Sequence, residues 1–236
     1  MIRIKKHKVS IVMPVFNEAE IIGQVVRDFY LKILKKINNS EFVICEDGST
    51  DGTKEILKNL QKKIPLKLHT SRKRKGAIQG YKDSLNSAKN EIILFSDSDG
   101  THDPNDFFKL IKKIDDYDMV IGWKSPRQDP FYRLFISRIF NLVINLLLGT
   151  KFHDINSGFR LIKKSLVEKL LPKTGLFPAC ILTELTLLAI KDGYKVTEVP
   201  VKHFKRKGES RALNTKKLPK LIWGVLRSII KIRFQK

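Results

Sequence analysis

The chain has 236 residues, 42% of them hydrophobic and 9% aromatic, which is typical of a folded soluble protein with one sizeable core. Its 46 Lys and Arg against 24 Asp and Glu give a net charge of +22, which predicts a polyanionic partner: nucleic acid, an anionic membrane face or a phosphate-rich substrate. No leader follows Met1 and no apolar run approaches the roughly 18 residues that span a bilayer, so we expect a cytoplasmic protein, with attachment to a membrane surface left open.

Short apolar runs alternate with segments of helical apolar spacing through the first half of the chain. Strands are predicted at residues 9–13, ended by Pro14, and at 41–45, 66–69, 91–95 and 119–121. Helices are predicted at residues 18–37, from about 51, at 76–88 and from 104. Strands that alternate with helices of this length indicate βαβ units and a mostly parallel sheet.

A helix with unusually dense apolar positions is predicted at residues 132–148. It is either a core helix or a helix that lies along a membrane or lines a lipid groove. A second helix near residues 181–191 and a strand at 196–201 follow. Residues 216–236 pair apolar with basic positions and predict a basic amphipathic helix, which suits an anionic surface or packs on the protein itself.

Two carboxylates, Asp97 and Asp99, stand one residue apart where the strand predicted at 91–95 ends. In an open α/β sheet, ligands bind at the carboxyl ends of the strands. Two hard oxygen donors there suit a Mg²⁺ or Mn²⁺ ion that is also held by substrate phosphates. The alternative is that both aspartates only form a turn and cap the helix after Pro104.

Polar turns also follow the first two strands, at residues 15–18 and 46–53. Gly48 and Gly52 allow close backbone approach, and Asp47 can accept a hydrogen bond from a base imide or amide. Taken singly, each turn is also explained as an Asx turn or a helix cap. Taken with the aspartate pair, they predict a nucleotide-plus-metal site in which Phe16 packs against the base.

Several other residues carry weaker signals. We expect His102, beside the aspartate pair, in a solvated loop rather than on a metal. Asp154 and Glu184 either line a substrate pocket or serve as a helix cap or surface carboxylate. The basic run at residues 72–75 is expected to be solvated or to attract a diphosphate or an anionic lipid. Cys45 lies in a strand pattern and is predicted as a small core residue.

With these motifs the chain resembles the family 2 glycosyltransferases, and among them the polyprenyl-phosphate glycosyltransferases such as dolichol-phosphate mannose synthase. The resemblance covers residues 9–211. The family's opening Pro-x-(Tyr/Phe)-Asn-Glu is present as Pro14, Phe16, Asn17 and Glu18. In its Asp-Asp-Gly-Ser-x-Asp-Gly-Thr, Glu46 replaces the first aspartate and Asp47 keeps the second. Its Asp-x-Asp is Asp97 and Asp99.

The second half carries the motifs of this branch, which are Gly-Ser-Arg, an Arg-x-x-x-Ser-Arg helix, Ser-Gly-Phe-Arg and Arg-x-x-Gly-x-Ser. Here they appear as Gly122-Trp123-Lys124, Arg133 with Ser137-Arg138, residues 157–160, and Arg206 with Gly208 and Ser210. Lys124 replaces an arginine and loses its bidentate fork. Thr101 stands where many relatives have a glutamine that completes the metal shell.

The resemblance implies a Rossmann-like nucleotide-sugar-binding glycosyltransferase fold, an α/β fold with a mostly parallel central sheet, followed by the C-terminal amphipathic helix. The implied catalytic domain spans residues 1–211, with a donor half at about 1–122 and an acceptor half at about 123–211. A basic amphipathic tail occupies residues 212–236.

The resemblance also implies roles for individual residues. Donor binding is expected of Pro14, Phe16, Glu18 and Asp47. Metal binding by Mg²⁺ or Mn²⁺ is expected at Asp97 and Asp99, which act in catalysis together with Arg206. The acceptor's phosphate is expected to bind Lys124, Arg133 and Ser137.

The expected activity is inverting transfer of mannose or glucose from a nucleoside diphosphate sugar, GDP-mannose or UDP-glucose, to a dolichyl or undecaprenyl phosphate. The protein is expected to be peripheral on the cytoplasmic face of the membrane, anchored by its tail or by a separate membrane subunit. One alternative is a family 2 enzyme with a soluble or glycan acceptor in polysaccharide synthesis. The other, a basic nucleic-acid-binding protein, explains the charge but not the acidic turns, which repel a polyanion, so we expect no nucleic-acid partner.

Overall fold

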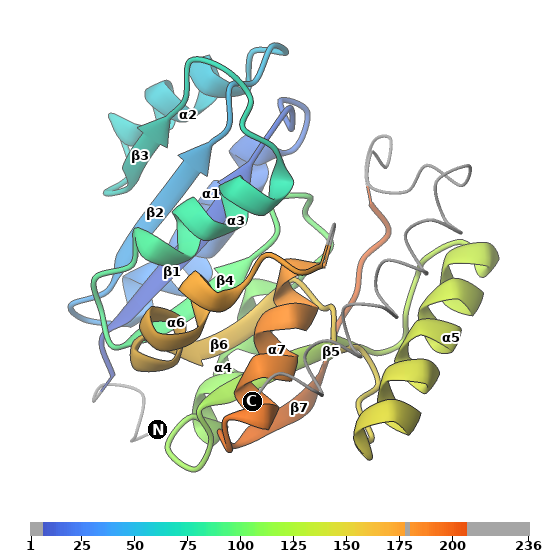
Figure 1. The fold of residues 1–236 in the computed structure, drawn as a ribbon. Helices are drawn as coiled ribbons and strands as arrows, with labels where there is room; N and C mark the ends of the chain where they lie inside the picture. Colours follow the sequence, from blue (N-terminus) through green and yellow to red (C-terminus); the bar gives the residue numbers. More distant parts are fainter. Residues whose placement is uncertain (1–6, 178–179, 207–236) are drawn as a thin grey trace.

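A seven-stranded sheet organises the molecule in the order β3-β2-β1-β4-β6-β5-β7 (Figure 1). The computed structural model describes residues 7–177 and 180–206. Its strands are β1 Val9–Val15, β2 Glu41–Glu46, β3 Lys67–Thr70, β4 Ile92–Ser96, β5 Met119–Lys124, β6 Phe159–Lys163 and β7 Val196–Val201. The predicted, mostly parallel sheet is confirmed, because only β6 runs antiparallel to its neighbours β4 and β5.

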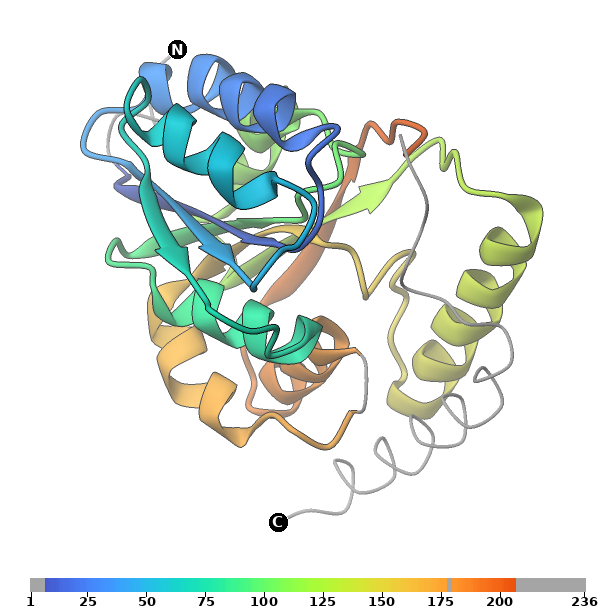
Figure 2. The ribbon, with the colours of Figure 1, turned by 90° about the horizontal axis from the view of Figure 1, so that it is seen from above.

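Helices cover both faces of the sheet (Figures 1 and 2). They are α1 Ile22–Lys32, α2 Thr53–Gln61, α3 Ala77–Asn86, α4 Phe107–Leu110, α5 Phe131–Leu148, α6 Lys164–Leu170 and α7 Ile181–Lys191. Alternate strand residues face opposite sides, so Ile11 packs in one core with α1, α2 and α4, while Val12 packs in the other with α3, α6 and α7. The two cores pack against opposite faces of the sheet. Together they hold the carboxyl ends of β1, β2 and β4 at the same edge of the sheet.

Pro14 does not end the first strand, which continues to Val15. It pairs with Cys45 of β2, whereas the pairing of β1 with β4 stops at Val12 and Phe95. The missing proline amide therefore costs no ladder bond on the β4 side. Cys45 is buried, as predicted for a small core residue.

Two predicted helices are shorter than their apolar spacing indicates. The segment predicted at 18–37 contains α1 and a separate 3-10 turn, Leu34–Lys36. The helix predicted from 104 is a chain of short turns around α4, and it begins where Asp103 accepts a hydrogen bond from the backbone amide of Asn105. Residues 15–21 stay outside the helix, which leaves them available for the turn after β1.

Neither β6 nor α6 was predicted. Phe159 and Arg160, which end the Ser-Gly-Phe-Arg motif, begin a central strand. The arginine interrupts an apolar run that otherwise reads as a strand, and it is fully buried, with 0% of its surface exposed. The predicted amphipathic helix and the boundary at residue 211 lie outside the described residues. Within the described ranges, no helix combines the length and apolarity needed to cross a bilayer.

Candidate active site

The turns after β1 and β2 are tied to each other by side chains. The backbone amide of Asn17 donates to Ser49 Oγ at 2.9 Å, and Asn17 Oδ1 accepts from the Thr50 amide at 2.8 Å. The Glu18 amide donates to Thr53 Oγ1 at 2.9 Å. These contacts fix Phe16 and Glu18, two of the predicted donor-binding residues, beside the second turn.

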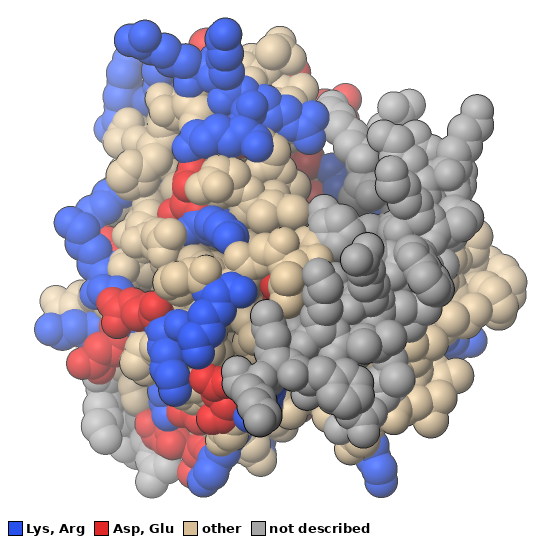
Figure 3. All heavy atoms as spheres, viewed as in Figure 1, with Lys and Arg blue, Asp and Glu red and all other residues tan. Residues whose placement is uncertain are grey.

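Asp47 holds a third segment, the basic loop at residues 72–75, against these turns. Its carboxylate accepts from the backbone amides of Lys75 at 2.7 Å and Gly76 at 2.9 Å. The loop is exposed, as predicted. Figure 3 shows Lys and Arg side chains gathered at the top of the molecule in that view. The Arg74 guanidinium lies 4.1 Å from the centroid of the Phe16 ring. A cavity of ≈ 400 Å³ opens beside Asp47. Contact of Asp47 with a base stays a prediction.

Gly48 explains how closely the basic loop approaches the second turn. Its φ is +70°, a left-handed conformation that favours glycine. A Cβ atom there would lie 2.7 Å from the Arg74 backbone nitrogen. Since no such contact is tolerated, the glycine permits the close backbone approach that the sequence predicted.

Arg206 joins two predicted site residues that lie far from it in the chain. Its Nη2 donates to Glu18 Oε1 at 2.5 Å, and its Nη1 pairs with Asp99 Oδ2 at 3.3 Å. Thr101 Oγ1 donates to Asp99 Oδ1 at 2.7 Å. Burial raises the pKa of Asp99, but the Thr101 hydrogen bond and the Arg206 charge together hold that pKa below its ordinary value. Asp99 is therefore ionised at neutral pH.

Asp97 lies deeper than Asp99 and touches the Ser-Gly-Phe-Arg segment. Its Oδ1 accepts from the Tyr81 hydroxyl at 3.1 Å. A Cβ at Gly158 would lie 1.9 Å from Asp97 Oδ2, so only glycine leaves room for this carboxylate. Burial and the neighbouring Asp99 charge raise the pKa of Asp97 to about 6. The pair thus combines one carboxylate with a raised pKa and one with a lowered pKa at the end of β4.

The aspartate pair is compatible with a divalent metal that is shared with phosphates. The described residues contain no cluster of three or more His, Cys, Asp or Glu side chains that forms a protein-only metal cage. Mg²⁺ usually binds one or two carboxylates together with substrate phosphates and water, which is the donor set that Asp97 and Asp99 provide. Thr101 stands where the family resemblance implies a glutamine in the metal shell, and its hydroxyl donates a hydrogen bond to Asp99.

His102 was expected in a solvated loop, and that expectation is wrong. The ring is buried and stacks on Phe159 at 5.1 Å between centroids. Neither ring nitrogen has a hydrogen-bond partner among the described residues. Burial and the Lys124 charge lower the pKa of His102 to about 3, so the ring is neutral. A neutral imidazole with two orphaned nitrogens beside Asp99 adds to the fit for a metal.

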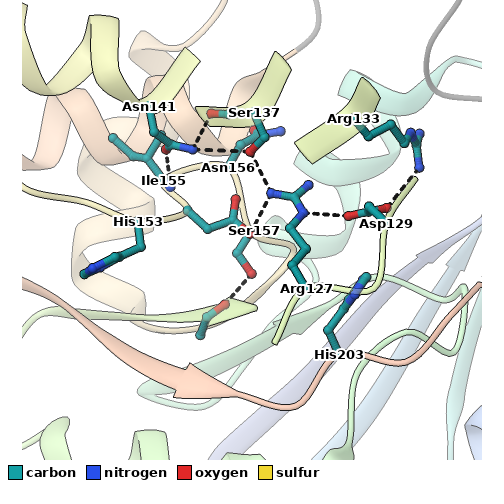
Figure 4. A network of polar contacts seen from close by, with 12 residues as sticks. Arg127, Asp129, Arg133, Ser137, Asn141, His153, Ile155, Asn156, Ser157 and His203 are labelled. Carbon is teal, nitrogen blue, oxygen red and sulfur yellow. Dashed lines mark hydrogen bonds and ion pairs between the residues drawn. The ribbon is translucent and has the colours of Figure 1, made fainter. Parts of the chain in front are cut away.

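Two of the predicted acceptor residues, Arg133 and Ser137, lie at the amino end of α5 (Figure 4). Lys124 ends β5, and its charge acts on Asp97 and on Asp129. Arg133 Nη1 pairs with Asp129 Oδ1 at 3.4 Å. Ser137 Oγ accepts from Arg127 Nη1 at 2.6 Å. Arg127 and Asp129 were not predicted, although a basic residue three positions after Lys124 and an aspartate before the helix proline were visible signals.

The two carboxylates expected in a pocket, in a cap or at the surface differ in their surroundings. Glu184 is fully buried, and its Oε1 accepts from the amides of Gly175 at 2.9 Å and Leu176 at 2.8 Å. It is neither a surface carboxylate nor part of the aspartate site. Asp154 is also buried, and its Oδ2 lies 3.6 Å from Arg127 Nη1. Asp154 therefore belongs to the cluster at α5.

α5 is not a core helix. Ile144 and Asn141 bury one side of it, and Asn141 Oδ1 accepts from the Ile155 amide at 3.1 Å. The opposite side exposes large apolar residues, namely Phe131, Tyr132, Phe135, Ile139, Leu142 and Leu146. Figures 1 and 2 both place α5 to one side of the sheet. An exposed apolar stripe of this kind marks an interaction surface.

Known proteins resemble the chain in sequence and in fold. The model for glycosyl transferase family 2 matches residues 10–171. An uncharacterized protein of Methanocaldococcus jannaschii is 33% identical over 84% of this chain and 82% of its own. The polyprenol monophosphomannose synthase of Mycolicibacterium smegmatis is 28% identical over 81% of this chain and 75% of its own.

Solved structures share the fold at lower identity. The glucosyl-3-phosphoglycerate synthase of Mycobacterium tuberculosis, in complex with Mn²⁺, UDP and phosphoglyceric acid, has a TM-score of 0.73 at 15% identity and covers 94% of this chain and 78% of its own. A mannosyltransferase of Pyrobaculum calidifontis, in complex with GDP-Man and Mn²⁺, has a TM-score of 0.71 at 20% identity. The match covers 98% of this chain and 65% of the mannosyltransferase chain. These likenesses confirm the predicted fold.

Proposed function

The chain belongs to glycosyl transferase family 2, and we propose that it transfers mannose or glucose, with inversion, from GDP-mannose or UDP-glucose to a polyprenyl phosphate. One observation carries the choice of acceptor. The cationic pair of Arg127 and Arg133 lies at the amino end of α5, and the exposed apolar stripe runs along the same helix. A phosphate joined to a long apolar chain matches that pairing.

The donor half would bind the nucleoside diphosphate at the edge formed by the turns after β1, β2 and β4. Phe16 and Asp47 would contact the base, with Pro14 beside them in β1. Arg206, oriented by Glu18 and Asp99, has the planar fork that suits a diphosphate. Its charge would stabilise the departing nucleoside diphosphate.

Asp97 and Asp99 would hold Mg²⁺ or Mn²⁺, with the unpartnered ring of His102 beside them. When bound, the metal supplies Lewis-acid stabilisation of the leaving diphosphate. The family neighbours with Mn²⁺ support this proposal. A phosphate monoester has a second pKa of about 6 and is mostly dianionic at neutral pH, so its oxygen needs no strong general base. Lys124, Arg133 and Ser137 would instead position that oxygen in line with the sugar's anomeric carbon.

We also propose peripheral attachment to the cytoplasmic membrane face, and the same apolar surface supports attachment to a membrane. The apolar stripe of α5 would lie in the headgroup region, and the predicted basic tail or a separate membrane subunit would strengthen binding. Removal of residues 216–236 should reduce co-sedimentation with anionic vesicles. Unchanged co-sedimentation would exclude the tail as an anchor.

Transfer of radiolabelled sugar tests the function directly. GDP-mannose and UDP-glucose are each incubated with the protein, polyprenyl phosphate and Mg²⁺ or Mn²⁺, with Asp99→Ala as the control. Metal-dependent label in the lipid phase, lost in Asp99→Ala, is the expected result and names the donor. Metal-dependent label only on a soluble acceptor, or donor hydrolysis alone, would keep the glycosyltransferase and reject the lipid acceptor.

A further inference from the structure

A carboxylate bridges two arginines at the amino end of α5 (Figure 4). Arg127 Nε donates to Asp129 Oδ2 at 2.6 Å, and Arg133 Nη1 lies 3.4 Å from Asp129 Oδ1. Only 12% of the Asp129 side chain is exposed. Burial raises its pKa, but the Arg127 hydrogen bond and charge hold that pKa below its ordinary value. An ionised carboxylate therefore occupies the point where both guanidinium groups converge.

Arg127 has more interaction partners than this carboxylate. Its Nη1 donates to Ser137 Oγ at 2.6 Å and lies 3.6 Å from Asp154 Oδ2, which has no hydrogen-bond partner among the described residues. The guanidinium thus joins the loop after β5, the first two turns of α5 and the segment before β6. It reaches the hydroxyl of Ser137, which the family resemblance assigns to the acceptor phosphate.

We propose that Arg127 is a phosphate-binding residue and that Asp129 is an internal counter-ion, which a phosphate monoester dianion displaces from the two arginines. This inference rests on the proposed function, since it treats the cluster as the acceptor phosphate site. Lys124 provides only a point charge, whereas Arg127 supplies a planar fork that can hold two phosphate oxygens. The structure thereby adds a residue to the site that the motif comparison could not find.

The exchange is favourable on grounds of charge and geometry. A carboxylate offers two oxygens and one negative charge, whereas a monoester dianion offers three terminal oxygens and nearly two charges. The dianion can therefore satisfy Arg127, Arg133 and the Ser137 hydroxyl together. Until it binds, Asp129 offsets the repulsion between the two guanidinium groups. A phosphate diester, with a single charge, competes poorly with Asp129, so the cluster selects monoesters.

Direct binding tests the exchange without any transfer reaction. Isothermal titration calorimetry on the full chain uses farnesyl phosphate as a lipid monoester, 3-phosphoglycerate as a soluble monoester and a dialkyl phosphate as a diester. Asp129→Asn removes the charge but keeps the shape, so it should bind a monoester about fivefold more tightly. Arg127→Gln should bind it at least about tenfold more weakly, with partial recovery in Arg127→Lys. Arg27→Gln, an exposed arginine on α1 outside every motif of the site, is the matched control and should bind like the wild type.

The direction of the Asp129→Asn effect separates the proposal from a structural role. If Asp129 only orders Arg127, its substitution weakens monoester binding, and that result or an unchanged affinity overturns the proposal. The thermal midpoint of each variant identifies any loss of folding. The proposal is also overturned if the wild type binds neither farnesyl phosphate nor 3-phosphoglycerate. Tight binding of 3-phosphoglycerate alone, with the expected variant pattern, upholds the exchange while the lipid acceptor fails.

Discussion

Two loops in the proposed donor and acceptor halves are held by side chains of opposite charge. In the donor half, the Asp47 carboxylate accepts from the backbone amides of Lys75 and Gly76. In the acceptor half, Arg160 donates to carbonyl oxygens and Arg127 donates to a carboxylate. Under the proposed function both halves would bind a phosphate group. The aspartate pair of the donor half would then need a cation to bind its diphosphate, whereas the arginines of the acceptor half would bind an anion directly.

Metal removal gives the largest expected difference between the halves. Chelation with EDTA should lower transfer at least about thousandfold, because the metal contributes several kcal/mol to stabilisation of the leaving group. Calorimetric binding of a phosphate monoester should change less than about twofold, since arginines supply that site. Restoration by Mn²⁺ or Mg²⁺ is the control. Equal loss of monoester binding on chelation would contradict the comparison.

Arg160→Met tests how far one buried guanidinium supports the acceptor half. Arg160 donates to the carbonyls of Ser157, Ile155 and Leu182, and burial lowers its pKa to about 10. Its removal leaves these carbonyls unsatisfied, and we expect a loss of about 3–5 kcal/mol in unfolding free energy. Urea denaturation measures this. Arg138→Met, at an exposed position, should stay within about 0.5 kcal/mol of the wild type.

Gly158→Ala tests a contact by which the acceptor half shapes the aspartate pair. A Cβ at Gly158 overlaps Asp97 Oδ2, so the carboxylate must move. We expect kcat to fall about a hundredfold, or ~2.7 kcal/mol. Gly80→Ala is the matched control, because its Cβ meets nothing closer than Pro14 Cβ at 3.8 Å. Similar kcat values for both variants would show that the position of Asp97 is unimportant.

Asp47→Ala should have the smallest effect and act on one half only. Two backbone amides lose their acceptor, which we expect to cost about 1–3 kcal/mol in unfolding free energy. The released basic loop should raise KM for the sugar donor and leave KM for the acceptor unchanged. Asn141→Ala, which frees the Ile155 amide, should show the reverse pattern. Steady-state kinetics with each substrate varied in turn measures both KM values. If either variant changed KM for the donor and KM for the acceptor together, the two halves would not bind their substrates independently.

Sequence patterns predicted most of the strands and the grouping of the turns. β1, β2 and β4 are buried along almost their whole length, so each appears in the sequence as a short continuous apolar run, and parallel strands must bring their carboxyl ends to one edge. The same patterns failed at β6, because a buried arginine resembles a surface residue in a single sequence. They also failed at His102 and Glu184, where burial is decided by distant segments that pack over them.

Patterns in the sequence were enough to predict a mostly parallel sheet, the acidic and polar residues at its strand ends and the family of the chain. These properties depend on local periodicity and on motifs of a few residues. The charged pairs between distant segments could be found only in the folded chain, as for Arg206 with Glu18 and Asp99 and for Arg127 with Asp154. Arg206 and Glu18 lie far apart in the chain, and pairing across that distance depends on how β7 and β1 sit in the sheet rather than on neighbouring residues.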